Sequence, residues 1–252
     1  MTSLARAPRA VDLPLRGDLR YGLELARLAA DPAFLRPRRQ AGAPPVLLIP
    51  GFMAGDRSLG ALRGWLRRRG SLTASAGLGL NIDGGERTVG AMKERLHRLA
   101  ARAGRSVVLI RRSRGGELGR VLAARNPDTG ASLVMLGSPV LDPLSVGAGT
   151  LRAVRSIACR GDLGLPGMFS NQCREGECCA AYREHLGAPL PETINAVAIY
   201  SRSDGIVSWE ACLDPCARHV EVKSSHTGMS VNRDVYRVLA DILEQEERRW
   251  SG

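Results

Sequence analysis

Long apolar runs are absent from this sequence. No apolar stretch in its 252 residues approaches the roughly 20 residues that a helix needs to span a bilayer. We therefore expect no integral membrane segment. Residues 1–9 carry scattered basic side chains, but the apolar segment that follows such residues in a secretory signal peptide is missing. This pattern predicts a cytoplasmic protein.

Aromatic residues and lysine are also scarce. Aromatic side chains make up 4% of the chain, too few for the clustered platforms on which nucleic-acid bases stack. Only Lys93 and Lys223 are lysines, so arginine supplies most of the positive charge behind the net charge of +11. The arginines are spread along the chain, and we interpret them as a solvated surface with no nucleic-acid partner. An anion-binding protein, whose binding would fall steeply with salt, is an alternative hypothesis.

A metal-binding cysteine pattern is missing as well. The six cysteines lie at positions 159, 173, 178, 179, 212 and 216. Structural zinc takes four ligands, usually in closely spaced cysteine pairs, and Cys212 and Cys216 fit such a pair only loosely. We therefore expect no metal site. In a cytoplasmic chain these cysteines are predicted to be free or redox-labile rather than paired in structural disulfides.

The chain does contain a regular alternation of strand and helix patterns, and its hydrophobic content of 44% suits one domain with a sizeable core. Apolar runs predict strands at 45–50, 78–82, 107–110, 133–136, 194–200 and 220–222. Apolar residues at helical spacing predict helices at 17–30, 59–66, 89–100, 118–126 and 232–246. This alternation indicates an α/β fold with a doubly wound, mostly parallel sheet. We expect a single domain over residues 1–252, with residues 139–191 as an excursion in which the alternation breaks down.

The stretch most informative about function is Val107-Val-Leu-Ile-Arg-Arg-Ser-Arg-Gly-Gly116. An apolar strand runs toward Ser113, and a helical pattern follows the two glycines. A strand, a sharp turn carrying a serine, and a helix form the context of a nucleophile elbow. The turn lifts the hydroxyl clear of the sheet, and free N–H groups at the helix start favour a developing oxyanion. The pattern G-x-S-x-G requires glycine two residues before the serine, and this chain has Arg111 there.

A serine nucleophile needs a base within hydrogen-bond reach and an acid that orients the base. In the elbow arrangement the acid and then the histidine follow the serine along the chain, each at the carboxyl end of a strand. Only His226, directly after the last predicted strand, meets both conditions. The other histidines lie at positions 97, 185 and 219. The best-placed acid is Asp204, in the turn after the preceding strand, and Asp142 and Asp214 are weaker alternatives.

Two backbone N–H donors complete a site of this kind, because the attacked carbonyl oxygen becomes negatively charged. One donor is predicted at Arg114, the residue directly after the serine. The other is predicted at Phe52, in the glycine-rich turn that begins at Gly51 after the first clear strand.

Several segments together resemble the α/β-hydrolase superfamily and are closest to the lipase-like hydrolases of high-GC bacteria. They are Pro50-Gly-Phe52, Ser113-Arg-Gly-Gly116, Leu136-Gly-Ser-Pro139, Tyr200-Ser-Arg-Ser-Asp-Gly-Ile-Val207 and Ser225-His226. The resemblance implies a triad of Ser113, Asp204 and His226 as nucleophile, acid and base. It also implies that the N–H groups of Phe52 and Arg114 form the oxyanion hole.

By the same resemblance, residues 139–191 would form a cap over the site. We expect a carboxylic-ester hydrolase that works through an acyl-enzyme on a small-molecule ester and needs no cofactor. The apolar residues at 163–169 favour a hydrophobic acyl group. The alternative hypothesis is a catalytically inactive hydrolase-fold protein with a binding or scaffold role, because Arg111 could crowd an elbow that glycine would leave open.

Overall fold

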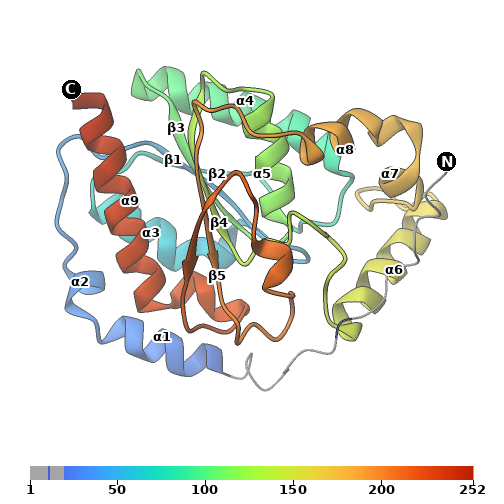
Figure 1. The fold of residues 1–252 in the computed structure, drawn as a ribbon, viewed down its shortest axis with the longest axis horizontal. Helices are drawn as coiled ribbons and strands as arrows, with labels where there is room; N and C mark the ends of the chain where they lie inside the picture. The colour runs from blue at the N-terminus through green and yellow to red at the C-terminus, as the bar shows by residue number, and fades with distance from the viewer. Residues whose placement is uncertain (1–10, 12–19, 252) are drawn as a thin grey trace.

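A single parallel sheet of six strands forms the centre of the molecule (Figure 1). The computed structural model describes Val11 and residues 20–251. The strand order is β2-β1-β3-β4-β5-β6, and every neighbouring pair is parallel. The strands are β1 (Val46–Ile49), β2 (Thr73–Ser75), β3 (Val107–Arg112), β4 (Gly130–Leu136), β5 (Asn195–Tyr200) and β6 (Arg218–Glu221). The predicted α/β fold with a parallel sheet is confirmed.

The central strands are apolar because helices cover both faces of the sheet. In β3, Val107 and Leu109 pack into one core cluster, while Val108 and Ile110 pack into a second cluster on the opposite face. Side chains alternate between the two faces of a strand, so both sets must be apolar when both faces are buried.

One face of the sheet is covered by helices from both ends of the described chain, as Figure 1 shows. This layer contains α1 (Tyr21–Ala29), α3 (Gly60–Arg68) and α9 (Arg233–Ser251). The other face is covered by α4 (Gly85–Ala103), α5 (Gly115–Ala124) and α8 (Ala180–Gly187). Shorter helical pieces are α2 (Pro32–Leu35), α7 (Gln172–Glu175), η2 (Asp56–Leu59), η3 (Glu177–Cys179), η4 (Glu210–Cys212) and η5 (Thr227–Val231).

One expectation about local structure is wrong. Residues 78–82 form a loop instead of a strand, and the edge strand is β2, which precedes them. β2 pairs only with β1 and is partly exposed, so its sequence, Thr-Ala-Ser, lacks the apolar signal of a central strand. The irregular region 139–191 contains a 15-residue helix, α6 (Ala148–Asp162). Few of its residues are buried, which explains its weak helical pattern.

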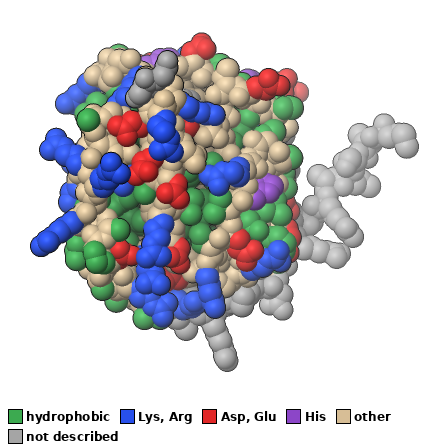
Figure 2. All heavy atoms as spheres, turned by 60° about the vertical axis from the view of Figure 1, so that its left-hand side comes forward, with side chains coloured by type: hydrophobic (Ala, Val, Ile, Leu, Met, Phe, Trp, Pro, Cys, Tyr) green, Lys and Arg blue, Asp and Glu red, His purple; other side chains and the backbone are tan. Residues whose placement is uncertain are grey.

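The remaining predicted elements are found, with boundaries shifted by a few residues. The helix expected at 17–30 is present as α1, although residues 12–19 lie outside the described part of the chain. Figure 2 shows basic side chains scattered over one face, with acidic and apolar side chains between them. Within residues 20–251, no helix combines the length and apolar character needed to cross a bilayer.

A buried ion pair joins α5 to the loop before β6. Arg120 Nη1 lies 3.0 Å from Asp214 Oδ2, and the two side chains are 6% and 1% exposed. Arg120 also donates hydrogen bonds to the carbonyls of Leu186 and Ala188 at the end of α8. The pair therefore holds three segments together in the helical layer that contains α5.

Asp214→Asn is expected to lower the free energy of unfolding by about 3–5 kcal/mol, because Arg120 would stay buried without its counter-charge. Urea unfolding monitored by circular dichroism measures this change. The control is Glu221→Gln, which removes one partner of the exposed Arg202–Glu221 pair and is expected to cost about 0–1 kcal/mol. Equal effects of the two substitutions would contradict a structural role for the buried pair.

Candidate active site

Ser113 occupies a sharp turn between β3 and α5. Its φ of 50° lies in the left-handed region, which non-glycine residues rarely adopt outside strained functional turns. Two backbone hydrogen bonds hold this conformation: the Ser113 N–H donates to the Leu136 carbonyl at 2.9 Å, and the Gly116 N–H donates to the Ser113 carbonyl at 2.7 Å. The predicted strand, turn and helix around this serine are therefore found.

The two glycines after the turn let α5 approach the sheet closely. A Cβ atom on Gly115 would lie 2.7 Å from the Pro50 carbonyl oxygen, and one on Gly116 would lie 2.2 Å from Ser138 Cβ. Side chains at these two positions would push the helix away from the ends of β1 and β4. Ser138, which follows β4, thus has a packing role beside the elbow.

Arg111 does not crowd the turn. It is the fifth residue of β3, and its backbone does not require the left-handed region, since Met53 and Ser113 are the non-glycine residues with positive φ in the described chain. Its fully buried side chain crosses Gly119 of α5, where an added Cβ would lie 1.8 Å from Arg111 Cδ. Arg111 Nη1 donates to the Gly116 carbonyl at 2.7 Å.

The buried guanidinium of Arg111 lies in an unusual electrostatic environment. Loss of solvation lowers the pKa of Arg111 well below its usual range, and the nearby positive charge of Arg120 lowers it further. Asp214 and Tyr182 partly oppose this effect. Arg111, which stands where the elbow pattern has glycine, therefore places a buried guanidinium between β3 and α5.

Asp204 and His226, which are 22 positions apart in the sequence, are in direct contact. His226 Nδ1 lies 2.7 Å from Asp204 Oδ2, and the side chains are 4% and 3% exposed. The second carboxylate oxygen, Oδ1, accepts hydrogen bonds from the N–H groups of Ile206 and Val207, both at 2.9 Å. These two bonds fix the carboxylate, which in turn orients the imidazole ring.

The other histidines and acids are held in different contacts. His97 Nε2 lies 2.9 Å from Asn126 Oδ1, His185 Nδ1 lies 2.6 Å from the Ala181 carbonyl, and His219 Nε2 lies 2.7 Å from the Asp214 carbonyl. Asp214 pairs with Arg120. Asp142 lines the cavity described below and accepts a hydrogen bond from the Leu144 N–H.

Phe52 and Arg114 contribute backbone N–H groups on either side of the Ser113 turn. Neither N–H is taken up by an acceptor within the described part of the chain. Asn81 links the two segments: its Nδ2 donates to the Pro50 carbonyl at 2.9 Å, and its Oδ1 accepts from Arg114 Nη1 at 2.7 Å. Asn81 therefore joins the turn after β1 to the Arg114 side chain beside Ser113.

Asn81 could not be identified from the sequence alone, since it belongs to the segment expected to form a strand. It is buried, and as part of a loop it bridges the turn after β1 to the elbow. The Arg114 guanidinium also donates to the Asp83 carbonyl and lies 5.1 Å from the centre of the Phe169 ring. Arg114 thus joins the elbow to this loop and to the segment after α6.

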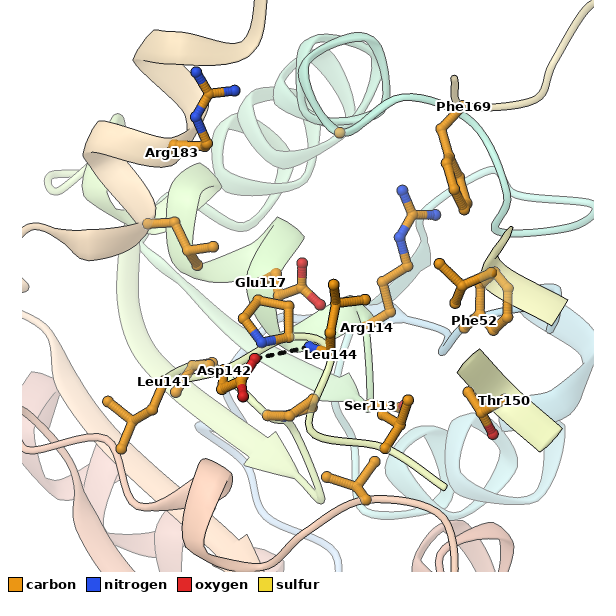
Figure 3. Close-up of a pocket in the computed structure, with 18 of the residues that line it drawn as sticks. Phe52, Ser113, Arg114, Glu117, Leu141, Asp142, Leu144, Thr150, Phe169 and Arg183 are labelled. Atoms are coloured by element: carbon orange, nitrogen blue, oxygen red, sulfur yellow. Dashed lines mark hydrogen bonds between the residues drawn. The ribbon is translucent and has the colours of Figure 1, made fainter. Parts of the chain in front are cut away.

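A cavity of about 420 Å³ opens above Ser113. Figure 3 shows Ser113 at its wall together with Phe52, Arg114 and Phe169. Apolar side chains predominate in the lining, namely Phe52, Val140, Leu141, Leu144, Val146, Val154, Phe169, Leu186, Ile206 and Val207. Its charged groups are Arg114, Glu117, Asp142 and Arg183. The arrangement suits an apolar ligand with a polar group near the serine.

The structure brings the five predicted site residues together in two groups. Ser113, Phe52 and Arg114 line one cavity, and Asp204 contacts His226 beside it, where Ile206 and Val207 both bind Asp204 and line the cavity. Ser113 and His226 are not hydrogen-bonded to each other in this structure. Catalytic hydrogen bonds commonly tighten only in the complex with substrate.

Among the described residues, no group of three or more His, Cys, Asp or Glu side chains is arranged to hold a metal ion. The cysteines at 159, 173, 179, 212 and 216 are free thiols. Cys173 lines the cavity, and burial raises the pKa of the Cys212 thiol far above its usual range. A neutral thiol at Cys212 is a poor nucleophile and metal ligand.

Comparison with known proteins identifies the architecture. No protein-family model matches the sequence, and no curated protein matches it significantly. Among solved structures, the mature lipase BlEst2 from Bacillus licheniformis matches with a TM-score of 0.61 and 14% identity, over 82% of this chain and 94% of the lipase. The chain has the α/β-hydrolase fold.

Two further α/β-hydrolase structures support this assignment. The mouse alpha/beta hydrolase domain-containing protein 10 matches with a TM-score of 0.54 and 17% identity, over 84% of this chain and 92% of its own. The enzyme MGS-MChE2, from a sediment metagenome of the Mar Chica lagoon in Morocco, matches with a TM-score of 0.53 and 16% identity, over 83% and 94%.

Gly119→Ala is expected to destabilise the protein by about 1–3 kcal/mol, because the new methyl group would overlap the buried Arg111 side chain. In an Arg111→Gly background the same substitution should be neutral or stabilising, since alanine is favoured over glycine inside a helix by about 1 kcal/mol. Urea unfolding of both single variants, the double variant and the wild type measures the coupling. Additive effects would show that Arg111 does not fill the space over Gly119.

Proposed function

We propose that this protein is a serine hydrolase of carboxylic esters. The observation that carries the proposal is the buried contact of His226 with Asp204, set beside a serine held in a left-handed turn at the wall of an apolar cavity. A histidine oriented by a carboxylate is the base that activates a serine hydroxyl. The lipase structure that shares the fold supports this chemistry.

In the proposed first half-reaction, Asp204 accepts the hydrogen bond from Nδ1–H of His226, which leaves Nε2 free as the base. Nε2 takes the proton of Ser113 as Oγ attacks the ester carbonyl carbon. The N–H groups of Phe52 and Arg114 stabilise the negative oxygen of the tetrahedral intermediate. The intermediate collapses, the bond to the alcohol oxygen breaks, and the alcohol leaves with the proton from His226.

In the second half-reaction, water attacks the acyl group on Ser113 and gives a proton to His226 Nε2. Collapse of this second intermediate releases the carboxylic acid and returns the proton to Ser113 Oγ. The chemistry uses side chains and backbone amides of this chain, and we propose no cofactor for it.

We also propose that residues 139–191 form a cap over the site. This segment supplies part of the cavity wall, including Val140, Leu144, Val154, Phe169 and Leu186. The proposed substrate is therefore a small-molecule ester with a lipophilic acyl group. The resemblance to lipase-like hydrolases of high-GC bacteria rests on the sequence motifs and is consistent with this substrate class.

The proposed function is tested with a fluorophosphonate, whose phosphorus is attacked by an activated serine with loss of fluoride. We expect stoichiometric labelling of the wild type, with the modification located on Ser113 by mass spectrometry. Ser113→Ala should not be labelled, and its kcat on esters should fall by about 10⁶-fold, as in serine enzymes that lose the nucleophile. Circular dichroism confirms that the variant is folded.

Absence of labelling in the folded wild type would contradict the mechanism and favour the inactive, binding or scaffold protein. In that case Arg111→Gly, which restores the glycine of the elbow pattern, is labelled only if Arg111 had blocked the site. Arg111 lies between β3 and α5 and does not line the cavity, which favours an active wild type.

The apolar lining predicts a dependence on acyl chain length. Each methylene group buried in the cavity contributes about 0.8 kcal/mol, so kcat/KM should rise about fourfold per methylene until the cavity is filled. Hydrolysis of p-nitrophenyl esters from acetate to laurate measures this trend. A preference for acetate would contradict binding of a lipophilic acyl group.

A further inference from the structure

A buried carboxylate from the N-terminal helix α1 is bonded to the loop that carries His226. Glu24 is 4% exposed. Its Oε1 accepts a hydrogen bond from the Ser225 N–H at 2.8 Å, and its Oε2 accepts from Ser224 Oγ at 2.7 Å. Oε2 is also 3.3 Å from Asn232 Nδ2, just before α9. The carboxylate thus bonds to both of the residues that precede His226.

The packing around this carboxylate leaves the loop little freedom. Ser224 and Ser225 have no exposed surface. A Cβ on Gly228 would lie 2.0 Å from Glu24 Oε2, so glycine at this position allows the loop to close onto the carboxylate. The Gly228 N–H donates to Ser225 Oγ at 3.0 Å. His226 therefore lies in a tight turn whose two ends both contact Glu24.

The same loop is held on its other side by the end of β5. Ser201 Oγ donates to the Ser224 carbonyl at 2.7 Å, and it accepts from the Ser224 N–H at 3.2 Å. Ser201 lies three residues before Asp204, so this contact joins the acid's turn to the histidine's loop. Two charged side chains outside the Asp204–His226 pair therefore bond to this loop: Glu24 at residues 224 and 225, and Arg112, whose Nη2 donates to the His226 carbonyl at 3.4 Å.

We propose that Glu24 is a positioning residue that sets the place of His226 relative to Ser113. This inference rests on the proposed function, because it assigns His226 the role of base. Glu24 acts through the backbone and side chains of residues 224 and 225, and it does not line the 420 Å³ cavity. It should therefore affect the chemical step and leave substrate binding unchanged.

The contacts require an acceptor at both carboxylate oxygens. The donors are a backbone N–H, a hydroxyl and an amide NH₂, and within residues 20–251 no basic side chain forms an ion pair with Glu24. Glutamine has nearly the same shape but would turn an NH₂ group toward one of these donors, so at least one bond would be lost. Glu24→Gln thus weakens the positioning contacts with minimal change of volume.

The experiment measures kcat and KM of Glu24→Gln on a p-nitrophenyl ester, with enzyme concentration taken from fluorophosphonate-titrated sites. We expect kcat per titrated site to fall by about 10²-fold, since displacement of a catalytic group by about 1 Å has an effect of this size. KM should stay within about twofold of the wild type, because the cavity is unchanged. Ser224→Ala, which removes one bond to Glu24, should reduce kcat by a smaller factor.

The matched control is Glu246→Gln. Glu246 on α9 is also fully buried, but it bonds to Asn195 at the start of β5, at the opposite end of the strand from the Asp204 turn. A substitution that acts only through stability would reduce the number of titrated sites in both variants and leave kcat per site unchanged. Wild-type kcat per site in Glu24→Gln, or an equal loss in Glu246→Gln, would overturn the inference.

Fluorophosphonate labelling of the wild type distinguishes failure of this inference from failure of the proposed function. An unlabelled wild type would refute the serine mechanism and with it any role of Glu24 in that mechanism. A labelled wild type with an unaffected Glu24→Gln variant would refute the positioning role alone. If Glu24→Gln does not fold, the folded Ser224→Ala variant decides the matter: unchanged kcat per site in Ser224→Ala would overturn the inference.

Discussion

The chain has to pass from a fully buried strand into a buried helix within two residues, and the rest of the site depends on this constraint. Ser113 accepts a left-handed backbone at a cost on the order of 1–3 kcal/mol. Hydrogen bonds to Leu136 and Gly116 hold the turn, and close approach of α5 to the sheet leaves no room for another path. The position of the hydroxyl and the direction of the Arg114 N–H both follow from this turn.

Parallel strands bring distant sequence segments to one edge of the sheet. The loops after β3, β5 and β6 carry Ser113, Asp204 and His226, and the sheet order places β3, β4, β5 and β6 side by side. The polar groups at this edge are buried, so each needs a defined partner. Backbone N–H groups bond to one carboxylate oxygen of Asp204, and His226 bonds to the other. In the loop around His226, Ser201 bonds to the Ser224 carbonyl and Glu24 bonds to the Ser225 N–H.

The elbow pattern has glycine at the position of Arg111 because a larger side chain there requires space between the strand and the helix. The backbone at this position is ordinary strand, so an L-residue causes no strain there. The space is supplied by Gly119 on the facing helix, and the arginine side chain runs through the gap to the Gly116 carbonyl. Arginine at position 111, which departs from the local pattern, is therefore accommodated by Gly119, eight positions further along the chain.

The sequence by itself determined the parallel α/β fold and the strand, turn and helix around Ser113, and it indicated that Asp204 and His226 lie close together. These depend on apolar runs, on glycines and on chain order, which are local signals. Tertiary structure alone decided the partners of Asn81, Glu24 and Arg120, and the true edge strand β2. Their contacts join residues from about 30 to about 200 positions apart. Such contacts form only when the sheet and the helices pack together. A buried polar group is then stabilised by the donor or acceptor that the packing places beside it.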